Sequence, residues 1–196
     1  MSEKNFTHLH VHSEYSLLDG AAPVKGLVKA AKEMGMNSIA ITDHGVMYAS
    51  VDFYKEALKE GIKPIIGCEV YVSQRTRFDK QKELDSRMYH LVLLAKNNNG
   101  YKNLIKIVSD GFVDGYYYKP RVDKELLKAY SADLICMSAC LAGELNSYIL
   151  DGEYEKAKQT ALWYKEVFGA ENYFIEQFAS FISWGFAFFC SSRPWS

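Results

Sequence analysis

The chain has 196 residues, with 23 lysines and arginines, 24 aspartates and glutamates, and a formal net charge of -1. This length is enough for one well-buried domain, and the balanced composition excludes a disordered chain. The near-zero charge gives no general basic surface for nucleic acid, so any contact with DNA has to come from a local patch.

Short apolar, β-branched segments alternate along the chain with amphipathic helical patterns. The predicted strands are residues 6–11, 38–42, 64–72, 89–95, 133–137 and 172–176. The predicted helices are residues 24–34, 51–60, 101–110, 123–130, 144–150 and 154–168. Such alternation predicts an α/β fold with parallel strands and helices packed outside them. A closed barrel normally has about seven or eight strands and roughly 250 residues, so we expect an incomplete one.

The two ends of the chain carry further expectations. The first residues lead into a predicted strand without an apolar signal segment, which predicts a cytoplasmic protein. The four cysteines have no framework spacing, so reduced thiols are expected. Residues 177–196 form an atypical tail, in which Phe178 to Cys190 is aromatic and uncharged but shorter than the roughly 20 residues that span a bilayer. We interpret the tail as non-native and out of frame, with an interaction tail as the alternative.

One local basic patch lies between Gln74 and Arg87. Its basic residues outnumber its acidic ones; they are Arg75, Arg77, Lys80, Lys82 and Arg87, against Asp79, Glu83 and Asp85. A charge run of this kind is usually a solvated loop, which is the favoured interpretation. A contact with DNA is the alternative.

Histidines are concentrated at the ends of the first predicted strands. His8, His10 and His12 alternate in the first strand and would share one face, while His44 follows the second strand and Glu69 lies on the third. The carboxyl ends of barrel strands meet at one mouth, so these side chains are expected to converge there. Imidazole and carboxylate ligands suit zinc, manganese or iron, and a bridging carboxylate such as Glu69 or Asp19 suits a site with more than one ion.

Each of these motifs also has an ordinary structural interpretation. A lone His-x-His pair is more often a surface or core feature than a ligand set, and Asp43 with Gly45 could simply form a turn. His90 could be a hydrogen-bonded strand end and Cys140 a buried thiol, and spacing alone assigns neither. The order of the other motifs at successive strand ends is what favours a metal site.

Four segments resemble the polymerase and histidinol phosphatase (PHP) domain, and more narrowly the N-terminal PHP domain of bacterial DNA polymerase III alpha subunits. They are residues 8–20, 41–45, 61–69 and 116–121. The resemblance covers about residues 6 to 176 and implies a distorted (β/α)7 TIM-like barrel, incomplete at its C-terminal end. We therefore expect residues 1–176 to be a partial PHP domain.

The resemblance implies a set of ligands for up to three divalent ions, zinc or manganese. The implied ligands are His10, His12, Asp19, His44, Glu69, His90 and Cys140. His8 occupies a position that the family does not use as a ligand, which leaves it as a candidate neighbour of the ligands. The family's final Asp-x-His ligand pair has no counterpart in this chain.

The resemblance also implies a role in DNA replication, as part of a DNA-directed DNA polymerase that contacts DNA and other holoenzyme subunits, and no membrane. The domain's own chemistry would be metal-dependent 3′–5′ exonuclease activity, a phosphodiester hydrolysis. With two ligands missing, this chain alone is expected to bind metal weakly and to be nearly inactive. The alternatives are a free-standing phosphoesterase similar to histidinol phosphatase and a non-catalytic structural module of the polymerase.

Overall fold

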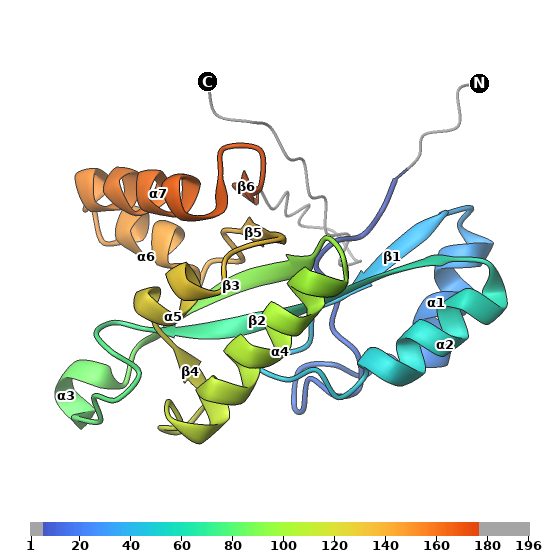
Figure 1. Ribbon diagram of the computed structural model, residues 1–196, viewed down its shortest axis with the longest axis horizontal. Helices are drawn as coiled ribbons and strands as arrows, with labels where there is room; N and C mark the ends of the chain where they lie inside the picture. The colour runs from blue at the N-terminus through green and yellow to red at the C-terminus, as the bar shows by residue number, and fades with distance from the viewer. Residues whose placement is uncertain (1–5, 177–196) are drawn as a thin grey trace.

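The computed structural model describes residues 6–176, and the predicted tail lies outside this range (Figure 1). The helices are α1 (Val24–Glu33), α2 (Ser50–Glu60), α3 (Lys82–Asp85), α4 (Asn98–Val113), α5 (Lys124–Ala129), α6 (Glu144–Leu150) and α7 (Tyr154–Phe168). The strands are β1 (Ser38–Ile41), β2 (Lys63–Ser73), β3 (Met88–Ala95), β4 (Arg121–Val122), β5 (Leu134–Met137) and β6 (Tyr173–Phe174). None of the described helices is both long enough and apolar enough to cross a bilayer.

The fold is mixed α/β, as predicted, but its strands are not all parallel. The sheet has the order β1-β2-β3-β5-β6, with β4 paired to β2. Strand β2 is parallel to β1 and β4, whereas β3 runs antiparallel to both β2 and β5. The expectation of parallel strands holds for the pairs β1–β2, β2–β4 and β5–β6 but is wrong for β3, because only a loop with the short α3 joins β2 to β3. A parallel crossover usually runs back along the sheet as a helix, and this segment contains no helix long enough to do so.

Strand β2 changes its partner halfway along its length. Residues 63–66 pair with β1, and residues 67–73 pair with β3. Gly67 stands at this change, where an added Cβ would lie 2.6 Å from the carbonyl oxygen of Leu93. A larger residue would therefore separate β2 from β3, two residues before Glu69.

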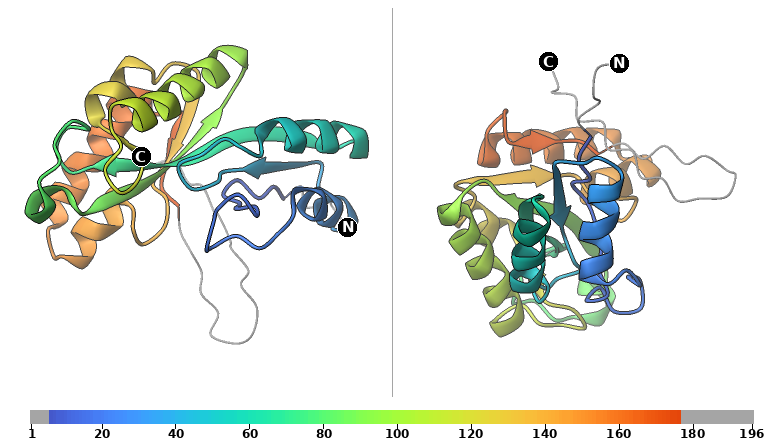
Figure 2. Two further views of the ribbon diagram at one scale, coloured as in Figure 1. Left: turned by 90° about the horizontal axis from the view of Figure 1, so that it is seen from below. Right: turned by 90° about the vertical axis from the view of Figure 1, so that its right-hand side faces the viewer.

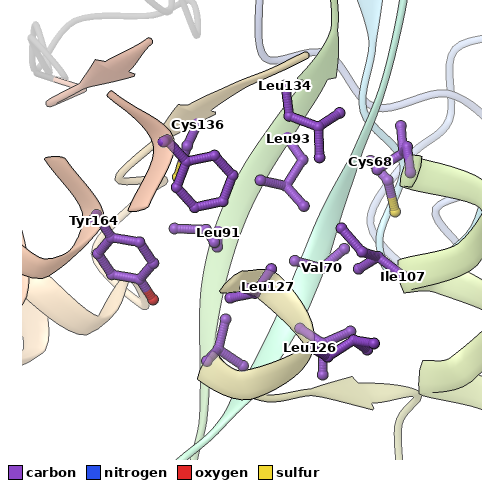
Figure 3. Packing of buried hydrophobic residues seen from close by; sticks show 14 of the residues in the cluster. Cys68, Val70, Leu91, Leu93, Ile107, Leu126, Leu127, Leu134, Cys136 and Tyr164 are labelled. Atoms are coloured by element: carbon purple, nitrogen blue, oxygen red, sulfur yellow. The ribbon is translucent and has the colours of Figure 1, made fainter. Parts of the chain in front are cut away.

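Two main apolar cores lie on either side of this change. One core packs α4, α5 and α7 against β2, β3 and β5, with Leu91, Leu93, Ile107 and Leu127 at its centre (Figure 3). The other packs α1 and α2 against β1, and includes the fully buried Phe53. Figure 2 shows α1 and α2 at one end of the molecule, with α6 and α7 at the other.

The predicted first strand is not a regular strand in the structure. It runs beside β1 and is joined to it by backbone hydrogen bonds from Ala40 to the carbonyl of His8, at 2.9 Å, and from Thr42 to the carbonyl of Val11, at 2.8 Å. The side chain of Thr42 adds a third link, because its Oγ1 accepts from the backbone N–H of Val11 at 2.8 Å. The histidine segment is therefore fixed to the sheet without being a full sheet member.

The arginines of the basic patch are paired within the chain. Arg75 contacts Asp85 at 2.6 Å, Arg77 contacts Asp123 at 3.0 Å, and Arg87 contacts Asp151 at 2.8 Å. These contacts favour the structural interpretation for the arginines, because a paired guanidinium is less available to phosphate.

Arg121, on β4, is fully buried and holds two loops together. Its Nε donates to the carbonyl of Gly115 at 3.1 Å. Its Nη2 donates to the carbonyls of Arg77 at 3.0 Å and Asp79 at 2.7 Å. The planar guanidinium can reach these carbonyls together, whereas a lysine ammonium cannot reproduce the same fork.

We therefore expect Arg121→Lys to lower the free energy of unfolding by about 2 kcal/mol, because hydrogen bonds to a buried charged group are lost. The control is Arg87→Lys, which alters an ion pair exposed to solvent and should cost less than about 1 kcal/mol. Urea unfolding followed by circular dichroism measures both changes. Equal losses in the two variants would contradict the anchoring role of Arg121.

Candidate metal centre

Glu69 is the centre of a group of histidines that come from separate parts of the chain. It lies on β2 with only 1% of its surface exposed. His44 follows β1 and forms an isolated parallel bridge with Glu69, and His90 lies on the neighbouring β3. The structure brings all seven predicted ligands into one network of contacts: His10, His12, Asp19, His44, Glu69, His90 and Cys140.

One oxygen of Glu69 faces two histidines and a thiol. Its Oε1 lies 2.8 Å from Nδ1 of His90 and 3.6 Å from Nε2 of His10. The Sγ of Cys140 lies 4.0 Å from the same oxygen and 3.6 Å from Nδ1 of His90. Cys140 therefore stands at the border of the group, beside His90.

The other oxygen of Glu69 faces the remaining two histidines. Its Oε2 contacts Nδ1 of His44 and lies 3.4 Å from Nε2 of His12. Nε2 of His44 points the other way and lies 3.0 Å from Oδ2 of Asp19. The Asp19 carboxylate is largely exposed, so this side of the group is open to solvent.

The contacts form two ligand groups that share Glu69. One is His10, His12 and Glu69, and the other is His44, Glu69 and His90; within each, one potential ligand atom per residue lies within 4.8 Å of the others. Each oxygen of Glu69 faces one histidine of each group, so the carboxylate belongs to both. A carboxylate shared in this way is a candidate bridge between two divalent ions.

The residues present fit such ions in their chemistry as well as in their arrangement. Oε2 of Glu69 and Nδ1 of His44 are buried and contact each other, yet neither has a hydrogen bond of acceptable geometry within the described residues. Buried polar atoms without hydrogen bonds are costly. A divalent cation would satisfy both atoms, because each has a lone pair available for coordination.

Asp43 fixes the loop that carries two of these ligands. It is buried and accepts from the backbone N–H of Ser13 at 2.6 Å and from the Ser13 hydroxyl at 2.8 Å. The Ser16 hydroxyl also donates to Asp43, at 2.7 Å, and its oxygen lies 2.9 Å from Nδ1 of His12. The same oxygen accepts from the backbone N–H of His44 at 3.1 Å. Sequence reasoning assigned Asp43 only a turn, but its side chain joins the first two histidine motifs.

Glu176 belongs to the site but was missed by the sequence analysis. Its Oε1 lies 3.0 Å from Nδ1 of His10, and its side chain is 2% exposed. Its backbone N–H donates to the hydroxyl of Ser138 at 2.9 Å, which fixes it beside β5. It ends a predicted strand, as His10 and His44 do, and this position was the signal that could have identified it.

The surroundings of these residues raise the pKa of some of them and lower the pKa of others. Burial alone would lower the pKa of His10, but hydrogen bonds to Glu176 and Glu69 raise it to about 10. Burial likewise opposes charge on His90, whose pKa is raised to about 9 by Cys140 and Glu69. Burial lowers the pKa of His12 to about 4. The histidines hold the pKa of Glu69 below its usual range despite burial, so Glu69 is an anion in this network.

His8 does not join either ligand group. Its ring packs edge-on against Phe6 with the ring centroids 4.7 Å apart, and its carbonyl accepts the backbone N–H of Ala40. The shared-face argument from strand alternation does not extend to His8, because this segment is not a regular strand.

Comparison with known proteins identifies the family of this chain. The PHP domain family model matches residues 8–179. The DNA polymerase III subunit alpha of Borreliella burgdorferi is 52% identical over 169 residues, which are 86% of this chain and 15% of that protein. The corresponding subunit of Treponema pallidum is 49% identical over 177 residues, or 90% of this chain and 15% of that protein. The chain thus spans about 15% of the length of these relatives.

The solved structures that this chain resembles are less similar to it than these sequence relatives are. An amidohydrolase from Chromobacterium violaceum, solved with bound sulfate and no metal, is 24% identical and covers 53% of this chain and 32% of its own. Its TM-score of 0.39 is too low to carry an argument. The family match rests instead on the sequence. The matched span, residues 8–179, contains most of the described residues and the positions of all seven predicted ligands. The chain belongs to the PHP domain family.

Proposed function

We propose that this chain is the metal-binding PHP domain of a bacterial DNA polymerase III alpha subunit. We further propose that its own chemistry is hydrolysis of phosphodiester bonds at DNA 3′ ends. The observation that carries the hydrolytic proposal is the sharing of Glu69 between two ligand groups. The polymerase context is supported by identities of 52% and 49% to alpha subunits. The whole protein would contact DNA and other holoenzyme subunits in the cytoplasm, where bacterial chromosomes are copied.

Different residues would hold each of the two ions in such a site, with Glu69 common to both. His10, His12 and Glu69 would hold one ion and His44, Glu69 and His90 a second, with Asp19 and Cys140 at the borders. Bound zinc or manganese would activate water and neutralise charge on the scissile phosphate. The low pKa of His12 keeps that imidazole neutral and ready to bind metal at neutral pH.

Exonuclease activity should depend on these histidines in a full-length alpha subunit that carries residues 1–176. We expect His12→Ala and His44→Ala each to abolish manganese- or zinc-dependent release of labelled nucleotide from primer 3′ ends, because each removes a ligand. The matched control is His8→Ala, which removes a neighbouring imidazole outside both ligand groups and should retain activity. If His12→Ala were as active as the unchanged subunit, the structural-module alternative would stand instead.

Metal binding by the present chain should show that Glu69 is shared. We expect Glu69→Gln to weaken zinc binding at both ligand groups, since the residue belongs to each. His90→Ala should weaken only one group and leave the His10 group able to bind. Titration with zinc under a competing chelator distinguishes the two variants by stoichiometry. Loss of the same number of ions in both variants would argue against a bridging role for Glu69.

Glu176 should support metal binding by orienting His10. Its carboxylate faces Nδ1 of His10 and so favours the tautomer with a proton on that nitrogen, which makes Nε2 the nitrogen that would bind metal. We expect Glu176→Ala to weaken zinc affinity about 10- to 100-fold, the usual effect of losing such a partner. Glu176→Gln retains an acceptor oxygen and should recover part of the loss. The exposed Glu171→Ala is the control and should bind zinc normally; equal affinity in Glu176→Ala would exclude the orienting role.

A further inference from the structure

A surface of exposed aromatic and basic side chains lies beside the metal centre and has no part in holding metal. We call it the tyrosine surface, and it consists of Phe78, Lys80, Tyr116, Tyr118 and Lys119. Its aromatic residues are 56%, 52% and 62% exposed for Phe78, Tyr116 and Tyr118 respectively. Each ring has one neighbour in the chain, which is Arg77 for Phe78, Phe112 for Tyr116 and Tyr117 for Tyr118. All three residues nevertheless stay more than half exposed, so this grouping indicates a binding surface.

The tyrosine surface comes from two chain segments, residues 78–80 and 116–119, and the buried Arg121 holds them together. Its guanidinium donates to the carbonyls of Arg77 and Asp79, which flank Phe78, and to the carbonyl of Gly115, which precedes Tyr116. Because Arg121 is fully buried, this link is rigid, and both segments present their side chains from one support.

The tyrosine surface reaches the metal centre through Tyr71. The ammonium of Lys119 lies 5.4 Å from the centroid of the Tyr71 ring. That ring lies 6.2 Å from the ring of His44 and 5.2 Å from the ring of His90. The turn after His44 also packs here, since a Cβ on Gly45 would stand 3.0 Å from Cγ of Pro120. A molecule bound along the tyrosine surface would therefore be separated from His44 and His90 by the ring of Tyr71.

The backbone at the centre of this surface is held in a costly conformation. Tyr118 has a φ of 62°, in the left-handed region that non-glycine residues seldom adopt. The turn is closed by a hydrogen bond from the backbone N–H of Tyr117 to the carbonyl of Lys119, at 3.0 Å. Strain of this kind persists where the surrounding structure requires it and is concentrated at functional sites.

The charges of this surface are free to meet an anion. Lys80 and Lys119 are exposed and make no ion pair within residues 6–176, unlike the arginines of the neighbouring basic patch. Two acidic residues of the same segment are occupied: Asp79 accepts from the hydroxyl of Thr76 at 2.6 Å, and Asp85 is bound by Arg75.

We propose that the tyrosine surface binds single-stranded DNA and leads its 3′ end to the metal centre. Bases would stack on Tyr118 and its aromatic neighbours, and backbone phosphates would contact Lys119 and Lys80. A duplex hides its base faces, whereas a single strand presents them to exposed rings. The proposal rests on the proposed function, because it supplies the substrate strand to that same site.

Binding of a fluorescent oligothymidylate, measured by anisotropy with EDTA present, tests the surface without any metal chemistry. We expect Tyr118→Ala to weaken binding about fivefold or more, the effect of losing one stacked base. Tyr118→Phe keeps the ring and should bind as the unchanged chain does. We expect Lys119→Ala to reduce the slope of log affinity against log salt by about 0.7, as for one lost phosphate contact on a single strand.

Tyr54→Ala and Lys55→Ala on α2 are the matched controls, since they remove an exposed tyrosine and a neighbouring lysine elsewhere on the molecule. Equal losses in the controls, unchanged binding by Tyr118→Ala, or equally tight binding of a duplex would each overturn the proposal. Zinc titration of the same chain separates the two proposals. A chain that binds no metal but binds the strand through Tyr118 would reject the hydrolytic site and retain the surface.

Discussion

A single buried anion, the carboxylate of Glu69, organises the structure around it. Burying a charge is costly unless it is paired and hydrogen bonded, and this one faces imidazoles from three separate segments of the chain. The pairing explains why the histidine segment, the turn after β1 and the start of β3 all meet at one place. It also explains why the fold tolerates so many titratable groups in close contact.

The change of partner along β2 puts that carboxylate where it can be reached from both sides. Before Gly67 the strand pairs with β1, and after it with β3, so Glu69 lies at the junction between the two halves of the sheet. His44 approaches from the β1 side and His90 from the β3 side. The two apolar cores provide rigid walls behind these approaches, which is what a site with closely spaced ligands requires.

The sequence predicted those parts of the fold that depend on local pattern. The bounds of α6 and α7 agree with the helical periodicity, since each helix buries one face against neighbouring elements. Strand direction depends on how distant segments connect, and no local pattern marked β3 as antiparallel. Strand β4 has only two residues, too few to give a period. The grouping of His10, His12, His44 and Glu69 could be predicted from their places along successive strands, and Glu176 shares this signal at the end of a predicted strand. His90 and Cys140 were implied by the family resemblance alone.

The contact between His10 and Glu176 joins residues 166 positions apart in the chain. During synthesis at about 5–20 residues per second, roughly ten to thirty seconds separate the appearance of the two residues. The histidines thus leave the ribosome well before the carboxylate that orients one of them. A newly made chain passes through a period in which His10 has been synthesised but Glu176 has not. The order of translation therefore makes this candidate metal centre one of the last features of the domain to mature.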